Sequence, residues 1–265
     1  MKPRGSVAGF SLVELLVAMV IGLLGIIVMM QMFSVFEEQK RTTTGGDDAI
    51  SSGSIALNSI TRDIQQSGWG IAHLHVVGCS VTGLVSGGAA IPLVPVTINP
   101  AGITGDANTD TLLVIYGNGN GTVEGDLIDA QPSANVYAVK AAESYTPGDI
   151  VVAVPQARPA TCTLARTTVA LNGISRPNVT VAAGVASMTN GRLYNLGSAP
   201  VVRAYAVRSG ALSVCDYTST NCASNGATWT QIASNVVSMR AQYGRDTAGA
   251  AMDGIADIWD QVMPT

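Results

Sequence analysis

Residues 10–36 most constrain this fold, because they read FSLVELLVAMVIGLLGIIVMMQMFSVF and carry a single charge, Glu14. A helix of about 20 apolar residues spans a bilayer, whereas the apolar core of a secretory signal has about 7–15 residues and precedes a small-residue cleavage site. This run is too long for such a signal, and no such site follows it. Residues 1–9 carry Lys2 and Arg4, and basic flanks stay in the cytoplasm. The sequence therefore predicts a membrane anchor with the remainder of the chain outside the cytoplasm.

Glu14 is out of place in a simple anchor. A carboxylate at mid-membrane costs about 2.5–3.5 kcal/mol on insertion scales. A cut between Gly9 and Phe10 would give it a partner, because the cut frees an α-amine with a pKa of about 8. In a set of staggered chains, the amine of one chain can then meet Glu14 of another. A buried pair of this kind specifies register more than it adds stability, so the pattern predicts a chain that polymerises.

The segment from Gly9 to Leu15, GFSLVEL, resembles the prepilin processing site of type IV pilins and of type II secretion pseudopilins. The resemblance implies that a prepilin peptidase cuts between Gly9 and Phe10, that Phe10 is N-methylated, and that Glu14 pairs with a neighbouring subunit's amine. It also implies an α+β, pilin-like fold, with a long N-terminal α-helix packed on a C-terminal antiparallel β-rich head. Such a protein is a single-pass inner-membrane protein with its head in the periplasm before assembly, and is part of a pilus at the cell surface afterwards.

Four segments are expected along the chain. They are a cleaved leader (1–9), a transmembrane and filament-core helix (10–36), an amphipathic helix continuing into the head (37–70) and a β-rich globular head (71–265). Ile50, Leu57 and Ile64 recur every seven residues, with Ile60 between the last two, which predicts an apolar stripe that packs against the head. Gly45-Gly46 is the expected position of a kink in the helix, with Asp47 or Asp48 capping the part that follows.

The composition favours a turn-rich β domain beyond residue 70. The chain has 265 residues, 29 of them glycine, and only 12% are charged. The formal net charge is −4 and the Lys and Arg residues form no run, so the composition gives nucleic-acid binding no support. Short apolar runs between turn residues predict strands at 110–117, 135–141, 149–155, 161–171, 192–197, 201–208, 211–217 and 233–246, with a hairpin at Ser209-Gly210.

Four cysteines form an even set without a C-x-x-C pair. Outside the cytoplasm this favours two disulfides over a zinc site. Cys215 and Cys222 enclose a short polar loop and are the preferred pair, which leaves Cys79 with Cys162.

Later segments extend the resemblance to one family of pilin-like proteins. ALNSITRDIQQSGWG, DTLLVIYG and GRLYNLGSAPVVRAYAVRSGALSV, together with NVVSMRAQYGRDTAGAAMDGIADIWD, are similar in order and spacing to PilW-type minor pilins. J-type pseudopilins of type II secretion share the leader and the helix and are the alternative. The absence of proline between Pro3 and Pro92 also differs from many pilins that build the main shaft.

The family resemblance implies the partners and the function. PilW-type proteins join other minor pilins, the major pilin and often a tip adhesin, at or near the pilus tip, and prime pilus assembly for motility and adhesion. The prepilin peptidase, the assembly platform and a separate ATPase are further partners, because this chain has no phosphate-binding loop. A head that binds an adhesin or another ligand is a further alternative.

Few other residues suggest a site. Asp246, Asp253 and Asp257, followed by Asp260, are weak calcium candidates, because hard cations prefer carboxylates near a turn glycine; the EF-hand spacing is absent, and a solvated acidic turn is the commoner explanation. His73 and His75 share a strand face with Cys79, and a structural role is the commoner explanation for them too. No catalytic motif is present, so neither an enzyme nor a cofactor is expected.

Overall fold

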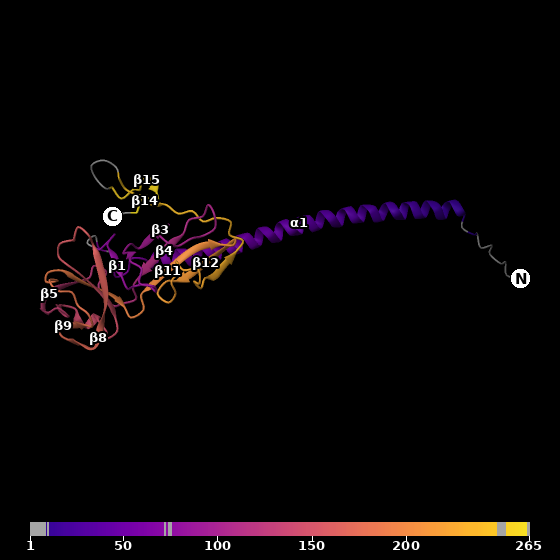
Figure 1. Ribbon diagram of the computed structural model, residues 1–265. Helices are drawn as coiled ribbons and strands as arrows, with labels where there is room; N and C mark the ends of the chain where they lie inside the picture. The colour runs from indigo at the N-terminus through magenta and orange to yellow at the C-terminus, as the bar shows by residue number, and fades with distance from the viewer. Residues whose placement is uncertain (1–8, 10, 72, 74–75, 248–252, 264–265) are drawn as a thin grey trace. The chain divides into compact units, whose positions relative to one another are not determined.

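A computed structural model describes residues 9, 11–71, 73, 76–247 and 253–263. The chain divides into two compact units, Met1–Ser51 and Ser52–Thr265, each of which is described by itself. One long helix, α1 (Leu12–Gln66), begins in the first unit and ends in the second, and all the strands follow it (Figure 1). The α+β class, with a long N-terminal apolar helix before an antiparallel β-rich domain, is confirmed.

The helix α1 runs without interruption through Gly45 and Gly46. The second cap expected at Asp47 or Asp48 is therefore wrong, because no new helix begins there. Glycine disfavours a helix by about 1 kcal/mol relative to alanine but leaves the backbone hydrogen bonds possible. Just before the glycines, the hydroxyls of Thr42 and Thr43 donate to the carbonyl oxygens of Glu38 and Gln39, one turn back.

The larger sheet of the second unit contains a closed ring of strands. Its order is β2 (Ile91–Pro92), β1 (Ser80–Thr82), β8 (Thr163–Ser175), β7 (Ile150–Val154), β10 (Arg192–Gly197), β5 (Asp126–Ser133), β6 (Val136–Val139) and β9 (Asn178–Val181). β9 also pairs with β8, so the last six strands form a small barrel. The long strand β8 makes this possible, because its first half pairs with β7 and its second half with β9. The short helix η1 (Ala142–Ser144) joins β6 to β7.

The barrel encloses its own apolar core. Fully buried side chains on five of its strands include Ile128, Tyr137, Val151, Val179 and Leu193. Register shifts interrupt the pairing of β5 with β6 and of β8 with β9. Such irregularities bend strands and allow a sheet to close.

The second sheet has five antiparallel strands and receives the end of α1. Its order is β13 (Thr230–Ser234), β12 (Ala211–Asp216), β11 (Val201–Arg208), β4 (Leu112–Tyr116) and β3 (Val96–Ile98). Ser209 and Gly210 both have positive φ, at 52° and 72°, and join β11 to β12 in the predicted hairpin. The carboxylate of Asp106 accepts both of their backbone N–H groups, and these hydrogen bonds hold its pKa below the ordinary value.

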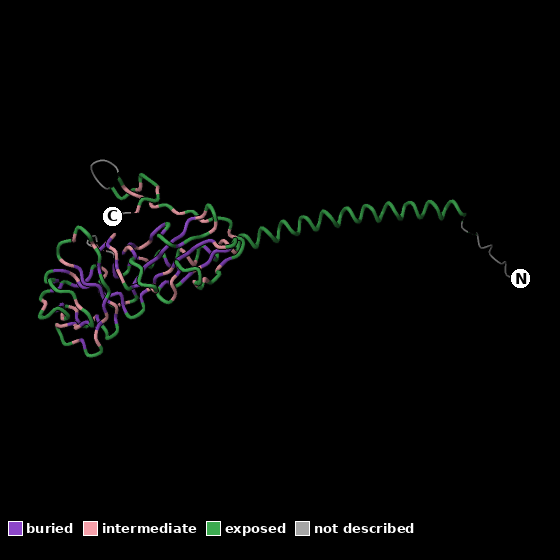
Figure 2. The backbone as a smooth tube through the Cα atoms, viewed as in Figure 1, coloured by how far each residue is buried: buried purple, intermediate pink, exposed green. Residues whose placement is uncertain are grey.

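The face of α1 that packs on this sheet matches the predicted stripe only at Ile60. Ala56 and Asp63 are buried, and Ile60 packs with the buried cluster formed by β4, β11 and β12. Ile50, Leu57 and Ile64 are exposed instead, Leu57 by 67%. Figure 2 shows α1 in green, and therefore exposed, along most of its length. Residues 56, 60 and 63 follow the spacing of one helix face. The small Ala56 lets the helix approach the sheet. Asp63 can be buried because both oxygens of its carboxylate accept hydrogen bonds.

The strand predictions were mostly confirmed. The seven predicted segments from 110–117 to 211–217 each contain an observed strand, β4, β6, β7, β8, β10, β11 and β12. The eighth prediction, 233–246, is wrong as one strand: it holds the end of β13 and the separate β14 (Tyr243–Arg245), and Asn235 leaves β13 with a positive φ of 58°. β14 pairs with β15 (Ile258–Asp260) as a hairpin of its own.

Candidate functional site

The candidate processing site lies at the start of the described chain. Gly9 is exposed and has no regular structure, Phe10 lies outside the described residues, and α1 begins at Leu12. A Cβ built on Gly9 meets nothing within 4 Å, and its φ is not in the left-handed region. No contact with a described residue therefore requires glycine at this position.

Glu14 occupies the first turn of α1 and is exposed. The backbone N–H groups of Glu14 and Leu15 both donate to the carbonyl oxygen of Ser11, at 3.0 and 3.2 Å, which opens the helix. A carboxylate in the first turn favours the helix by interacting with its dipole. Among the described residues, no cation forms a salt bridge with Glu14.

The apolar part of α1 that follows has no partner among the described residues. Every large apolar side chain from Leu12 to Phe36 is at least half exposed, Val17 being the lowest at 51%. This helix is long and apolar enough to cross a membrane, on length and composition. Its side chains bury nothing within the chain, so a lipid or protein environment must cover them in the cell.

Within the second unit, a polar cluster fixes α1 to the five-stranded sheet. Asp63 is 3% exposed, and its two carboxylate oxygens accept hydrogen bonds from Arg203 Nη1, each at 3.0 Å. The hydroxyls of Tyr116 and Tyr205 donate to the same carboxylate, at 3.1 and 2.6 Å. The cluster thus satisfies a buried charge with donors from β4 and β11. Buried ions persist when they are paired and hydrogen-bonded in this way.

Burial and the Asp63 carboxylate keep the tyrosines of this cluster protonated. Burial, followed by the hydrogen bond to Asp63, raises the pKa of Tyr205 to about 12. Burial and the Asp63 charge also raise the pKa of Tyr116. Both hydroxyls therefore remain donors at any physiological pH. Asp63 was not predicted as a buried or functional residue, although its spacing of seven from Ala56 places both on one helix face.

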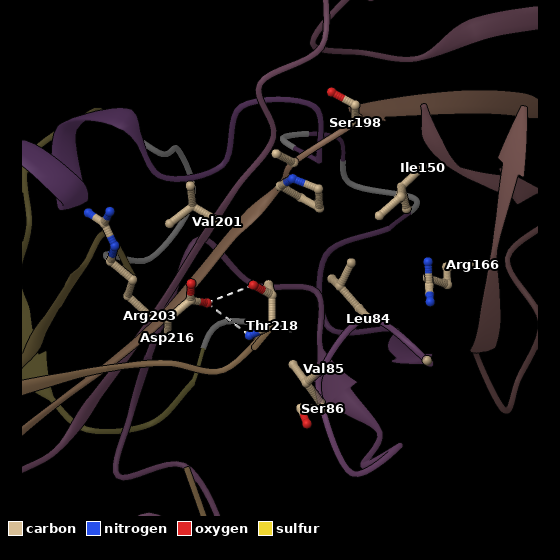
Figure 3. Close-up of a pocket in the computed structure, with 13 residues that line it drawn as sticks. Leu84, Val85, Ser86, Ile150, Arg166, Ser198, Val201, Arg203, Asp216 and Thr218 are labelled. Carbon is tan, nitrogen blue, oxygen red and sulfur yellow. Dashed lines mark hydrogen bonds between the residues drawn. The ribbon is translucent and has the colours of Figure 1, made fainter. Parts of the chain in front are cut away.

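A pocket of about 530 Å³ is lined in part by residues of β11 and β12 (Figure 3). Its wall combines apolar side chains with three hydroxyls, two arginines and one carboxylate, namely Leu84, Val85, Ile150, Val201, Ser86, Ser198, Thr218, Arg166, Arg203 and Asp216. Asp216 accepts hydrogen bonds from the backbone N–H and the hydroxyl of Thr218, at 3.0 and 2.7 Å. Two of the three charged side chains that line the pocket therefore already have hydrogen-bond partners: Asp216 is bonded to Thr218, and Arg203 to Asp63.

Both disulfides have the preferred pairing. Cys79 is joined to Cys162 across 83 residues, and Cys215 to Cys222 across 7. The first ties β1 to the start of β8, and the second closes the loop after β12. Cys79, Cys215 and Cys222 are buried in one apolar cluster.

The weak metal candidates do not converge on a metal site. Asp246, Asp253 and Asp257 each accept a backbone N–H within the same loop, from Gly254, Ile255 and Thr247, and Asp260 pairs with Arg245. The ring centroids of His73 and Tyr194 are 6.4 Å apart. His75 lies outside the described residues. Across the described residues, no group of three or more His, Cys, Asp or Glu side chains could hold a metal ion.

Comparison with known proteins recognises the N-terminal segment. The prokaryotic N-terminal methylation motif matches residues 4–30. No curated protein and no solved structure matches the chain. The matched segment contains Gly9, Phe10 and Glu14 together with residues 12–30, which are most of the exposed apolar part of α1. The chain thus carries the signal of type IV pilin-like proteins, a class that includes pilins and pseudopilins. This signal indicates a structural role, association with pilus-type assembly machinery and membrane anchoring before assembly.

Proposed function

We propose that this chain is a minor pilin of a type IV pilus, incorporated at or near the pilus tip, where it helps to prime assembly. The observation that carries the proposal is the methylation motif at residues 4–30, which includes the start of a helix whose apolar side chains are exposed. In this proposal the prepilin peptidase cuts between Gly9 and Phe10, and Phe10 is N-methylated. The exposed helix then packs among the helices of other subunits.

Glu14 is the proposed assembly residue. Its carboxylate is exposed and has no salt bridge to a described residue, so it is available to the α-amine of a neighbouring subunit. Such a pair sets how far one subunit is displaced from the next. The head lies in the periplasm before assembly, and the assembly platform and its ATPase supply the work of extrusion.

The choice of a minor pilin over a shaft pilin rests on sequence. The segments similar to PilW-type proteins and the proline-free helix favour it. A J-type pseudopilin would carry the same N-terminal signal, so a deletion strain decides between the two. Loss of surface pili and twitching with intact protein secretion supports the minor pilin, whereas lost secretion with normal pili would replace it by the pseudopilin.

The test of Glu14 uses the chain in its own cells. Glu14→Ala should reduce the amount of this subunit in sheared pili about tenfold or more, while the membrane level of the protein and its cleavage stay normal. Glu37→Ala is the matched control, because Glu37 is another exposed glutamate of α1, and it should incorporate normally. Normal incorporation of Glu14→Ala would contradict the proposed pairing.

A further inference from the structure

Trp69 is held rigidly while about half of its surface, 48%, remains exposed. Its indole N–H donates to the carbonyl oxygen of Gly119 at 3.2 Å, and its own carbonyl oxygen accepts from the Gly117 N–H at 2.8 Å. Gly68 and Gly70 flank it with φ of 84° and 80°, values that glycine adopts without strain. An exposed indole fixed on both sides is a preorganised platform, since little side-chain freedom remains to be lost on binding.

This indole forms part of a groove of about 710 Å³ after the end of α1, in the second unit. Tyr116 and Val123 add apolar surface, and the exposed residues Gln65, Gln66 and Asn118, whose side chains we call the rim amides, also line the groove. The described residues that line the groove carry no formal charge. The groove therefore combines an aromatic face with neutral hydrogen-bonding groups.

Two glycines that line the groove are required by a close approach of the main chain to β10. A Cβ on Gly117 would lie 2.9 Å from the carbonyl oxygen of Leu196, and one on Gly119 would lie 2.8 Å from the backbone nitrogen of Gly197. Because backbone atoms make these approaches, larger residues cannot be accommodated there. The main chain of this strand end comes close to β10, and no side chain of residues 117 or 119 fills the space beside Trp69.

We propose that this groove binds a neutral saccharide. One face of a sugar ring is lined with C–H groups and stacks on an indole, while its hydroxyls both donate and accept, as the side-chain amides of Gln and Asn do. A charged ligand would find no counter-charge on the lining. A purely apolar partner would bury the rim amides without hydrogen bonds, which costs about 1–3 kcal/mol for each unsatisfied group. This binding is a property of the head and goes beyond the proposed role in assembly.

The experiment uses the full chain in a detergent that has no sugar headgroup. Tryptophan fluorescence and calorimetry follow titration with lactose, maltotriose, cellotriose and chitotriose, and with sialyllactose as a negatively charged comparison. At least one neutral sugar should bind, and Trp69→Ala should weaken it by about tenfold or more. Trp259→Ala, which removes a more exposed indole at 64%, should bind like the parent chain.

Two further variants keep the test decisive if Trp69→Ala does not fold. Trp69→Phe preserves an aromatic face without the indole N–H, and Gln66→Ala removes one rim amide from an exposed position. Each should weaken sugar binding severalfold while the circular dichroism spectrum stays unchanged. Absence of binding for every neutral sugar at tens of millimolar, equal affinity for sialyllactose, or unchanged affinity in both variants would overturn the proposal.

Discussion

The first unit of this chain exposes its large apolar side chains, whereas the second unit buries most of its own. From Leu12 to Phe36 the large apolar side chains are all exposed within the chain. In Ser52–Thr265, three apolar clusters, two disulfides and a buried carboxylate hold the strands together. The apolar side chains of the first unit therefore need lipid or other protein chains to cover them, whereas the second unit is stabilised by contacts within itself. Changes in the second unit should therefore alter folding, and changes in the first should alter insertion and assembly.

The largest stability effect is expected from the long-range disulfide. Replacing Cys79 and Cys162 together with serine frees a loop of 83 residues and should lower the free energy of unfolding by about 4–5 kcal/mol. The same change at Cys215 and Cys222, which are separated by 7 residues, should cost about 2–3 kcal/mol. Guanidinium unfolding of the full chain in detergent, followed by near-ultraviolet circular dichroism, measures both. An equal or reversed order would contradict the role given to the Cys79–Cys162 bond.

The buried carboxylate of Asp63 should come next. Asp63→Ala leaves Arg203 and two tyrosine hydroxyls without their acceptor, and removing one partner of a buried pair costs about 3–5 kcal/mol. The expected value lies at the low end, because the Arg203 side chain is 42% exposed. Asp48→Ala changes an exposed aspartate of the same helix and should stay within about 0.5 kcal/mol of the parent. Equal stabilities of the two variants in the same unfolding experiment would remove Asp63 as the link between helix and sheet.

Neighbouring positions of α1 test which helix face packs on the head. Ala56→Leu adds volume to a buried contact and should destabilise the second unit by about 1–3 kcal/mol. Leu57→Ser removes a side chain that is 67% exposed and should change stability by less than about 0.5 kcal/mol. Thermal unfolding of both variants measures the two losses of stability. A larger loss in Leu57→Ser than in Ala56→Leu would show that Leu57 lies on the packed face.

The smallest effect is a pH dependence at Asp110, which ties the segment before β14 to the sheet. Burial alone would raise the pKa of its carboxylate, but hydrogen bonds from the Ala241 N–H, Asn99 and Gln261, with the Arg240 charge, lower it overall. A lowered pKa gives stability that is present above the unfolded value of about 4 and is lost as the pH falls through the folded value. Asp110→Asn should cost about 1–2 kcal/mol at pH 7 and flatten the loss of stability below pH 4.

The control for this pH experiment is Asp129→Asn, at an exposed position of β5. It should keep both the parent stability at pH 7 and the parent slope in acid. A parent-like acid slope in Asp110→Asn, measured by urea unfolding at several pH values, would show that other carboxylates govern the acid response.

Local patterns explain what could be predicted from the sequence. The processing motif and the apolar helix are contiguous, and strands such as β4 and β7 are unbroken apolar runs, so each was visible in a short window. The closing of the barrel was not visible, because it depends on register shifts in two strand pairings and on β8 pairing with both β7 and β9. Of the packed face of α1, Ile60 was predicted, but Ala56 and Asp63 were missed for a related reason. The energy of burying Asp63 depends on Tyr116, Tyr205 and Arg203, which lie far away in sequence.

The mature N-terminus tests the central claim most directly. Mass spectrometry of the protein purified from its own cells, with and without an active prepilin peptidase, identifies the first residue. The account predicts a chain that begins at Phe10 and carries one added methyl group on its α-amine, and an uncut chain when the peptidase is absent. A mature protein that retains Met1, or that begins beyond residue 30, would contradict it.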